Sequence, residues 1–119
     1  MRKQTQNDSL SLTFQALADP TRRAMLARLS KGEASVSDLA KPFLKTMSLP
    51  AVTKHLKVLE KASLITKTKD AQWRPCKLNG KAFKDVAEWM EPYQQMMEES
   101  FDRLEEYLKT VKKGKKYEK

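Results

Sequence analysis

The chain has few of the residues from which active sites and metal centres are usually built. Its 119 residues include one histidine, one cysteine and three glycines. This inventory leaves no Gly-rich phosphate-binding loop, no nucleophile elbow and no cluster of metal-binding Cys and His side chains. Paired carboxylates such as Glu98–Glu99 lie in a strongly periodic helical segment, where exposed charge is the usual interpretation. We therefore expect no enzyme activity, no bound metal and no other cofactor.

Long hydrophobic runs and paired cysteines are missing as well. No apolar segment approaches the roughly 20 residues that a membrane span requires. The opening segment, MRKQTQNDSLSL, has no apolar stretch of signal-peptide length. The lone Cys76 cannot form an internal disulfide, which agrees with a reducing compartment. These features predict a cytoplasmic protein that does not contact a membrane.

What the chain does have is positive charge. Its formal net charge is +9, although the segment 85–106 is rich in Asp and Glu. The segment up to Lys81 is basic, and so is the C-terminal sequence KTVKKGKKYEK. An excess of basic residues favours a polyanionic partner such as nucleic acid, because neutralising phosphates releases counterions. Net charge also keeps proteins soluble, so composition alone leaves both interpretations open.

Capping residues and apolar periodicity predict four short helices, two strands and one long helix. Ser9, Asp19, Ser35 and Ser48 are the expected helix caps, and Pro20 and Pro50 suit a first helical turn. Pro75 should confine the second strand to an edge or a ribbon. The expected elements are helices at 9–17, 20–31, 35–43 and 49–62, strands at 64–69 and 73–78 joined by a tight turn at 70–72, and a helix from Gly80 to residue 112.

The segment MSLPAVTKHLKVLEKASLI contains the helix with the clearest two-sided pattern. Val52, Leu56 and Leu59 share one narrow arc that must face the core, and basic and hydroxyl side chains occupy the opposite side. A short helix, a turn, this helix and then a β-ribbon is the layout of a winged helix-turn-helix, in which the second helix of the pair enters the major groove. The expected DNA-binding residues are Ser48, Pro50, Thr53, Lys54, His55, Lys57, Lys67, Lys69 and Arg74.

His55 has two open interpretations. It flanks the buried arc, which suits a packing and hydrogen-bonding residue, whereas the resemblance to a known family given below implies a contact with the DNA backbone. Lysines on an isolated helix are usually only solvated; here the order of elements and the basic ribbon favour DNA instead.

The long C-terminal helix carries an apolar stripe that a small core does not need. Its apolar residues recur every three or four positions as far as Val111, and Pro92 should kink the helix or split it in two. Left uncovered, such a stripe would expose a patch that monomers seldom tolerate, so we expect a homodimer. The expected interface residues on this helix are Met90, Tyr93, Met97, Phe101, Leu104 and Leu108.

The motifs LADPTRRAMLARL, SVSDLAKPF, MSLPAVTKHLKVLEKASLI and QWRPCKL together resemble the bacterial ArsR-type winged helix-turn-helix repressors. The resemblance covers roughly residues 10–108. It implies a homodimeric regulator, usually an autorepressor, that dimerises through its first and last helices, which adds Phe14 to the expected interface. The implied partner is double-stranded DNA with an inverted-repeat operator; no effector is implied.

The chain departs from the family pattern where metals bind. Metal-sensing members carry Cys-x-Cys at the third helix, and this chain has Ser35-Val36-Ser37. Serine hydroxyls are poor ligands for soft, thiophilic ions. The last helix also lacks the histidines of the other family site. We therefore expect a branch that does not respond to metals. The link 43–47 is about two residues longer than the common family version, and Ser63 replaces a usual glycine.

The fold prediction is a mainly α chain with a small β-hairpin, a winged helix-turn-helix with a long dimerisation helix. The expected divisions are a flexible N-terminus at 1–8, the DNA-binding domain at 9–79, the dimerisation helix at 80–112 with its kink near 92, and a flexible basic tail at 113–119. The leading functional hypothesis is a sequence-specific DNA-binding repressor. The alternative is a winged-helix protein-interaction module without specific DNA binding, because fold alone does not separate the two.

Overall fold

The computed structural model describes residues 8–68 and 75–118, with side chains described as far as residue 113. The chain forms two units, Met1–Val86 and Ala87–Lys119. The predicted turn at 70–72 and the side chains of Lys69, Trp73 and Arg74 lie outside the described residues, as does most of the segment predicted as a flexible N-terminus.

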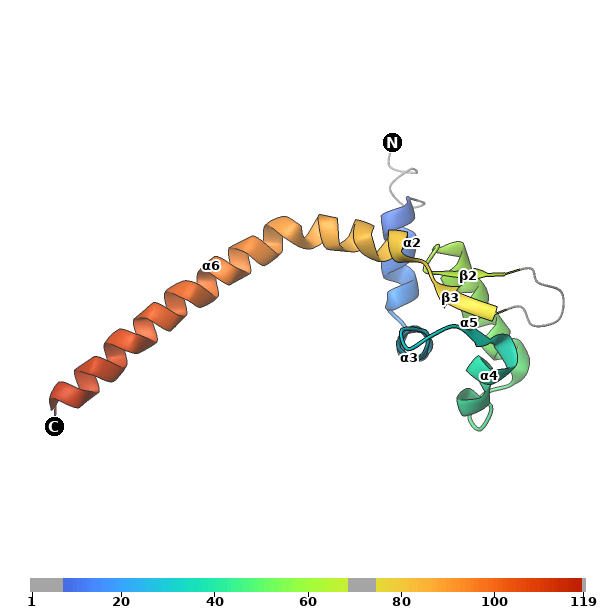
Figure 1. Cartoon of the computed structure of the whole chain (residues 1–119), viewed down its shortest axis with the longest axis horizontal. Helices are drawn as coiled ribbons and strands as arrows, with labels where there is room; N and C mark the ends of the chain where they lie inside the picture. Colours follow the sequence, from blue (N-terminus) through green and yellow to red (C-terminus); the bar gives the residue numbers. More distant parts are fainter. Residues whose placement is uncertain (1–7, 69–74, 119) are drawn as a thin grey trace. The chain divides into compact units, whose positions relative to one another are not determined.

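The first unit begins with two helices, α2 (Ser9–Leu17) and α3 (Pro20–Leu29) (Figure 1). Asp8 caps α2 by accepting a 2.7 Å hydrogen bond from the Ser11 amide, so the predicted cap Ser9 is wrong by one residue. A carboxylate one position earlier is an equally good cap and also suits the positive end of the helix dipole. Asp19 caps α3 as predicted, through the Arg22 amide at 3.0 Å.

The helix-turn-helix pair follows. Ser35 caps α4 (Val36–Ala40) by accepting from the Asp38 amide at 3.1 Å, and a 3₁₀ turn, η1 (Lys41–Phe43), extends it. The second helix of the pair, α5, spans Leu49–Lys61 and ends one residue before the predicted boundary. Ser63 then has a left-handed φ of 61°, in the position where the family usually has glycine.

A three-stranded antiparallel sheet completes the first unit. Its order is β1 (Ala34–Ser35), β3 (Pro75–Leu78), β2 (Ile65–Lys67), so the predicted hairpin gains a third strand. The prediction from Pro75 was an edge strand or a ribbon: β3 is central and so not an edge, but it does form an antiparallel ribbon with β2. Pro75 is tolerated there because it is the first residue of the strand, and its carbonyl still accepts from the Thr68 amide at 3.0 Å.

The core of the first unit is small and fully apolar at its centre. Its largest buried side chains are Met25, Leu39, Val52, Leu56, Leu59, Leu64, Ile65 and Cys76. They come from α3, α4, α5, the two longer strands and, for Leu64, the residue just before β2, so both helices of the helix-turn-helix contribute to one cluster. This shared core fixes the orientation of α5 within the unit.

The helix α6 spans Gly80–Glu118, and the second unit consists of its larger part. It continues through Pro92, so the predicted split does not occur, and the kink remains a prediction. The helix also runs six residues beyond the predicted end at 112. Lysine is a good helix former and is favoured near the negative C-terminal end of a helix, which explains the extension.

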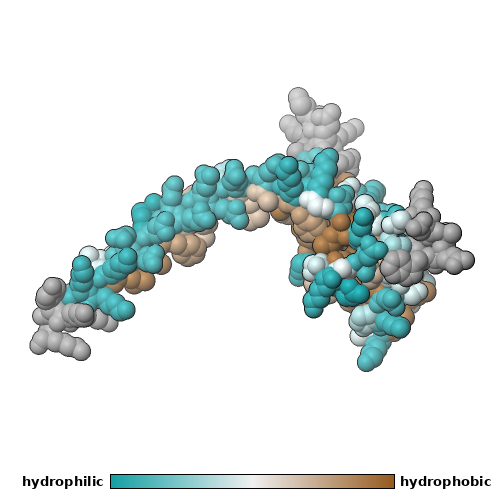
Figure 2. All heavy atoms as spheres, viewed as in Figure 1, coloured by the Kyte–Doolittle hydropathy of each residue, from teal (hydrophilic) through white to brown (hydrophobic). Residues whose placement is uncertain are grey.

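Figure 2 shows apolar residues gathered along one side of α6, with polar residues on the other. Among the described residues, no helix combines the length and the hydrophobicity that crossing a bilayer requires.

Candidate nucleic-acid interface

Helix α5 is anchored by its apolar arc. Val52, Leu56 and Leu59 are completely buried, as their spacing predicts. Ser48 caps the helix by accepting from the Ala51 amide at 3.3 Å, and Pro50 occupies the first turn without losing a hydrogen bond. One side of α5 is therefore committed to the core, which leaves the opposite side to present its side chains outward.

The outward side brings together the predicted recognition residues. Lys54, Lys57 and Pro50 are exposed, and Thr53 is partly buried beside them. Together with Leu49 these residues line an open surface depression. Leu49 was not among the expected site residues, because a helical wheel places it near the buried arc. Its position as the first residue of α5 was the available signal, since a first-turn side chain can project past the end of the core.

The link before α5 is held in a defined turn. The carbonyl of Phe43 accepts from the amides of Thr46 at 3.1 Å and Met47 at 3.0 Å, and from the Thr46 hydroxyl at 3.3 Å. Phe43 and Met47 also pack against the core. The two additional residues of the link are therefore accommodated by a compact turn between η1 and α5.

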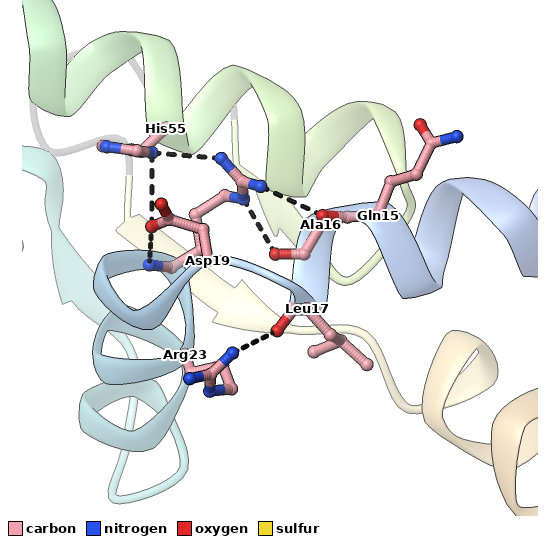
Figure 3. Close-up of polar contacts among 7 residues, drawn as sticks. Gln15, Ala16, Leu17, Asp19, Arg23 and His55 are labelled. Carbon is pink, nitrogen blue, oxygen red and sulfur yellow. Dashed lines mark hydrogen bonds and ion pairs between the residues drawn. The ribbon is translucent and has the colours of Figure 1, made fainter.

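His55 connects α5 to the start of α3 (Figure 3). Its Nδ1 lies 3.3 Å from Arg22 Nη1 and 3.9 Å from Asp19 Oδ2. Because a guanidinium can only donate, a hydrogen bond at this distance requires His55 to accept at Nδ1, which leaves the ring proton on Nε2. The structure thus gives His55 the packing and hydrogen-bonding role, and its contact with DNA remains a prediction.

The DPTRR motif explains this connection. Arg22 donates to the carbonyls of Ala16 at 2.8 Å and Gln15 at 3.0 Å, and Arg23 donates to the carbonyl of Leu17 at 2.7 Å. These carbonyls lie in the last turn of α2, where amides that would continue the helix are missing. The Gln15 carbonyl also accepts from the amide of the C-cap residue Ala18 at 3.2 Å. The two arginines therefore close α2, and Arg22 also reaches α5. The hydrogen bond from its amide holds the pKa of Asp19 below the usual value, with help from the charge of Arg22.

Two lysines of the predicted ribbon lie on the described strands. Lys67 on β2 lies 3.8 Å from Glu60 on α5, so its ammonium group is close to the recognition helix. Lys77 on β3 is exposed, and the sequence prediction of site residues did not include it. The sequence signal for its exposure was its place next to Cys76, because successive side chains of a strand point to opposite faces of the sheet and Cys76 is buried. Burial raises the pKa of the Cys76 thiol, which argues against a reactive cysteine.

Comparisons with known proteins agree with this geometry. Residues 17–68 match a family model described as a helix-turn-helix domain. The transcriptional repressor SdpR of Bacillus subtilis is 34% identical over 77 residues, which cover 65% of this chain and 83% of SdpR. A crystal structure of an ArsR family transcriptional regulator, RHA00566, has 45% sequence identity and a TM-score of 0.69; the match covers 76% of this chain and 98% of that one.

The chain belongs to the ArsR family. It is a winged helix-turn-helix DNA-binding transcriptional regulator. The HTH-type transcriptional regulator Rv2034 of Mycobacterium tuberculosis is 50% identical over 52 residues, covering 44% of this chain and 47% of that protein.

In this ArsR-family chain, one of the two serines that replace the metal-binding thiols has a structural role. The Ser35 hydroxyl caps α4, as predicted, and Ser37 is exposed. Among residues 8–68 and 75–118, the structure contains no group of three or more His, Cys, Asp or Glu side chains placed to hold a metal ion.

The predicted dimer residues divide between the two units. Phe14 lies on α2 in the first unit, and 38% of its surface is exposed. The other members lie on α6 in the second unit, and each is at least 39% exposed: Met90, Tyr93, Met97, Phe101, Leu104 and Leu108. The rings of Trp89 and Tyr93 also contact each other, with centroids 5.0 Å apart.

Proposed function

We propose that this chain is a homodimeric repressor that binds an inverted-repeat DNA operator and controls its own gene. Each protomer inserts α5 into the major groove, with Thr53 and Lys54 at base edges and Ser48, Lys57 and Lys67 at phosphates. The observation that carries this proposal is the exposed face of α5, which is basic and lies opposite a fully buried arc. A groove about 12 Å wide admits such a helix.

Charge supports phosphate contacts from both α5 and the ribbon. Lys54, Lys57 and Lys77 are exposed, and Lys67 is paired with the half-exposed Glu60. Because exposed ion pairs contribute little, exchanging Glu60 for a phosphate costs little free energy. Lys69 and Arg74, outside the described residues, belong to the same proposed set. His55, with its ring proton on Nε2, can donate to a phosphate while Arg22 holds Nδ1.

The apolar stripe of α6 supports dimerisation. Its exposed members, together with Phe14 of α2, form the proposed interface. A symmetric dimer presents two recognition helices about one DNA turn apart, roughly 34 Å, which is why we propose an inverted repeat.

We also propose that the regulator works in the cytoplasm and does not respond to metals. Ser35 uses its hydroxyl as a helix cap, and a hydroxyl is a weak ligand for thiophilic ions. Chelators, zinc, cadmium and arsenite at sensing concentrations should leave operator binding unchanged in an electrophoretic mobility assay. Metal released stoichiometrically from the purified protein, with metal-dependent dissociation from DNA, would contradict this proposal.

The test of the proposed function is footprinting of the purified protein on the DNA upstream of its own gene, followed by titrations at several salt concentrations. Each phosphate contact contributes about −0.9 to the slope of log affinity against log salt concentration. We expect a protected inverted repeat and a steep slope. A nearly flat salt dependence with no protected sequence would favour the protein-interaction module instead.

A further inference from the structure

An apolar side chain lies at the end of the basic face of α5. Leu49 is the first residue of the helix, and 50% of its surface is exposed. It lines an open depression of about 370 Å³ together with Pro50, Thr53, Lys54 and Lys57. The depression therefore combines an apolar wall, made by a leucine and a proline, with two cationic side chains.

The exposure of Leu49 is not what its spacing predicts. It precedes Leu56 by seven residues, which places the two on the same side of a helix, yet Leu56 is completely buried. Leu49 thus contributes little to the core. Its surface is instead available to a partner, and covering it would be favourable because apolar area would leave water.

The surroundings of Leu49 indicate what that partner is. Lys54 and Lys57 bring positive charge to the same depression, which suits DNA. The apolar part is one leucine and one proline, far smaller than a stable protein–protein interface. In helix-turn-helix proteins the first residues of the recognition helix contact base edges.

The chemistry of the major groove then selects the base. Leucine and proline side chains can neither donate nor accept hydrogen bonds. The C5-methyl of thymine is the apolar group that base pairs display in the groove, and apolar side chains are its usual contacts. Over another base, Leu49 would remove polar atoms from water without replacing their hydrogen bonds, which is unfavourable.

We propose that Leu49, supported by Pro50, reads the C5-methyl group of a thymine in each half-site, so that Leu49 is a specificity-determining residue. This inference rests on the proposed function, because it requires α5 to enter the major groove. Thr53 and Lys54, which line the same depression, supply polar contacts.

The test removes single methyl groups from DNA. Preferred duplexes are selected from a random pool with the full-length protein, and each thymine is then replaced by deoxyuridine, which lacks only the C5-methyl. Affinities are measured by fluorescence anisotropy. Burial of one methyl-sized group corresponds to roughly a fourfold change in affinity, and to about fifteenfold when both half-sites are changed. We expect such a loss at one symmetric position.

Two variants assign the effect to its residue. Leu49→Ala should bind the thymine and deoxyuridine duplexes equally at that position. Leu44→Ala is the matched control, because Leu44 is 46% exposed but does not line the depression; it should keep the preference for thymine.

The outcomes separate this inference from the function on which it rests. Specific binding with no deoxyuridine effect at any position would overturn the methyl contact and leave the proposed function intact. A deoxyuridine effect that survives in Leu49→Ala would assign the methyl contact to another residue and overturn the role of Leu49. Failure to enrich any duplex would instead contradict the proposed function. The deoxyuridine comparison uses the wild-type protein, so it tests the methyl contact even if Leu49→Ala folds poorly.

Discussion

Thr53 and Lys54 lie side by side on the outward face of α5, opposite its buried arc. Replacing both with alanine should weaken specific binding by about 1–3 kcal/mol, because a lost base-edge contact costs this much, while the fold remains intact. Anisotropy titrations with selected and random duplexes measure the change, and circular dichroism checks the fold. Lys31→Ala is the control, since it removes one exposed positive charge outside α5. Unchanged operator affinity in the double variant would show that the recognition face lies elsewhere.

Asp19 provides a pH test of the capping network at the start of α3. Its pKa is lowered, first by the hydrogen bond from the Arg22 amide, so its charged form stabilises the folded state. This contribution is present above the ordinary aspartate pKa of about 3.9 and is lost as the pH falls through the lowered folded value. Asp19→Asn keeps a capping side chain but removes the charge. Its urea midpoint should therefore lie below that of the wild type at pH 6, and the difference should shrink toward pH 2. A difference that does not change with pH would contradict this role.

At the level of the element, α5 was predictable because three independent signals agree there: a serine cap, a proline in the first turn and an apolar arc. The strand β1 was not, because two residues carry no periodicity. The central position of β3 was not predicted, because a proline at the first position of a strand has the same sequence signature as one at an edge. The Arg22–His55 contact could not be found from local pattern, since 33 positions separate the residues. The exposure of Leu49 was not predicted, because a helical wheel shows the direction of a side chain around the axis but not its position along the helix.

The charge pattern of α6 predicts how two copies of the helix pair. The stripe repeats every eleven residues, as from Met90 to Phe101 and from Tyr93 to Leu104. Eleven residues make three turns at about 3.67 residues per turn, close to the roughly 3.6 of a straight helix. The charged residues of the segment 85–106 are almost all acidic, whereas Lys109, Lys112 and Lys113 are basic. A parallel pair would place acid against acid. An antiparallel pair, crossing near the middle of the stripe, places each basic end beside the acidic start of its partner, as coiled-coil charge pairs do.

Introduced cysteines can distinguish these arrangements, because the single native thiol, Cys76, is buried. Ser100→Cys lies near the predicted crossing point and should form a disulfide dimer under mild oxidation. Gln94→Cys flanks the stripe on its other side, and the antiparallel arrangement separates the two copies by about 15 Å along the axis, too far for a disulfide. Non-reducing gels report the result, with the wild type as control. Equal cross-linking at both positions would indicate a parallel pair, and none at either would exclude this face.

For the whole molecule, oligomeric state and DNA binding should change together. Phe101→Glu with Leu104→Glu places charge in the stripe and removes apolar burial worth about 1.5–3 kcal/mol per side chain, counted twice in a symmetric dimer. We expect monomers in sedimentation equilibrium and weaker operator binding, because one half-site cannot hold the complex alone. Gln95→Glu with Thr110→Glu is the matched control on the opposite side of α6. A wild-type chain that is monomeric at micromolar concentration, or a Phe101/Leu104 variant that still dimerises, would show that the interface lies elsewhere.

The uncovered stripe of α6 has a consequence for how the gene would be controlled. If repression requires two chains whose long helices pair, the amount of active repressor at low levels rises with the square of the amount of chain made. A protein that represses its own gene in this way leaves the promoter open after cell division or dilution. It represses the promoter over a narrow range of chain concentration, and no small molecule is needed to set the concentration at which repression begins. The threshold would be set by the apolar side chains of one helix, so substitutions among them would shift the steady level of the protein without touching a single base contact.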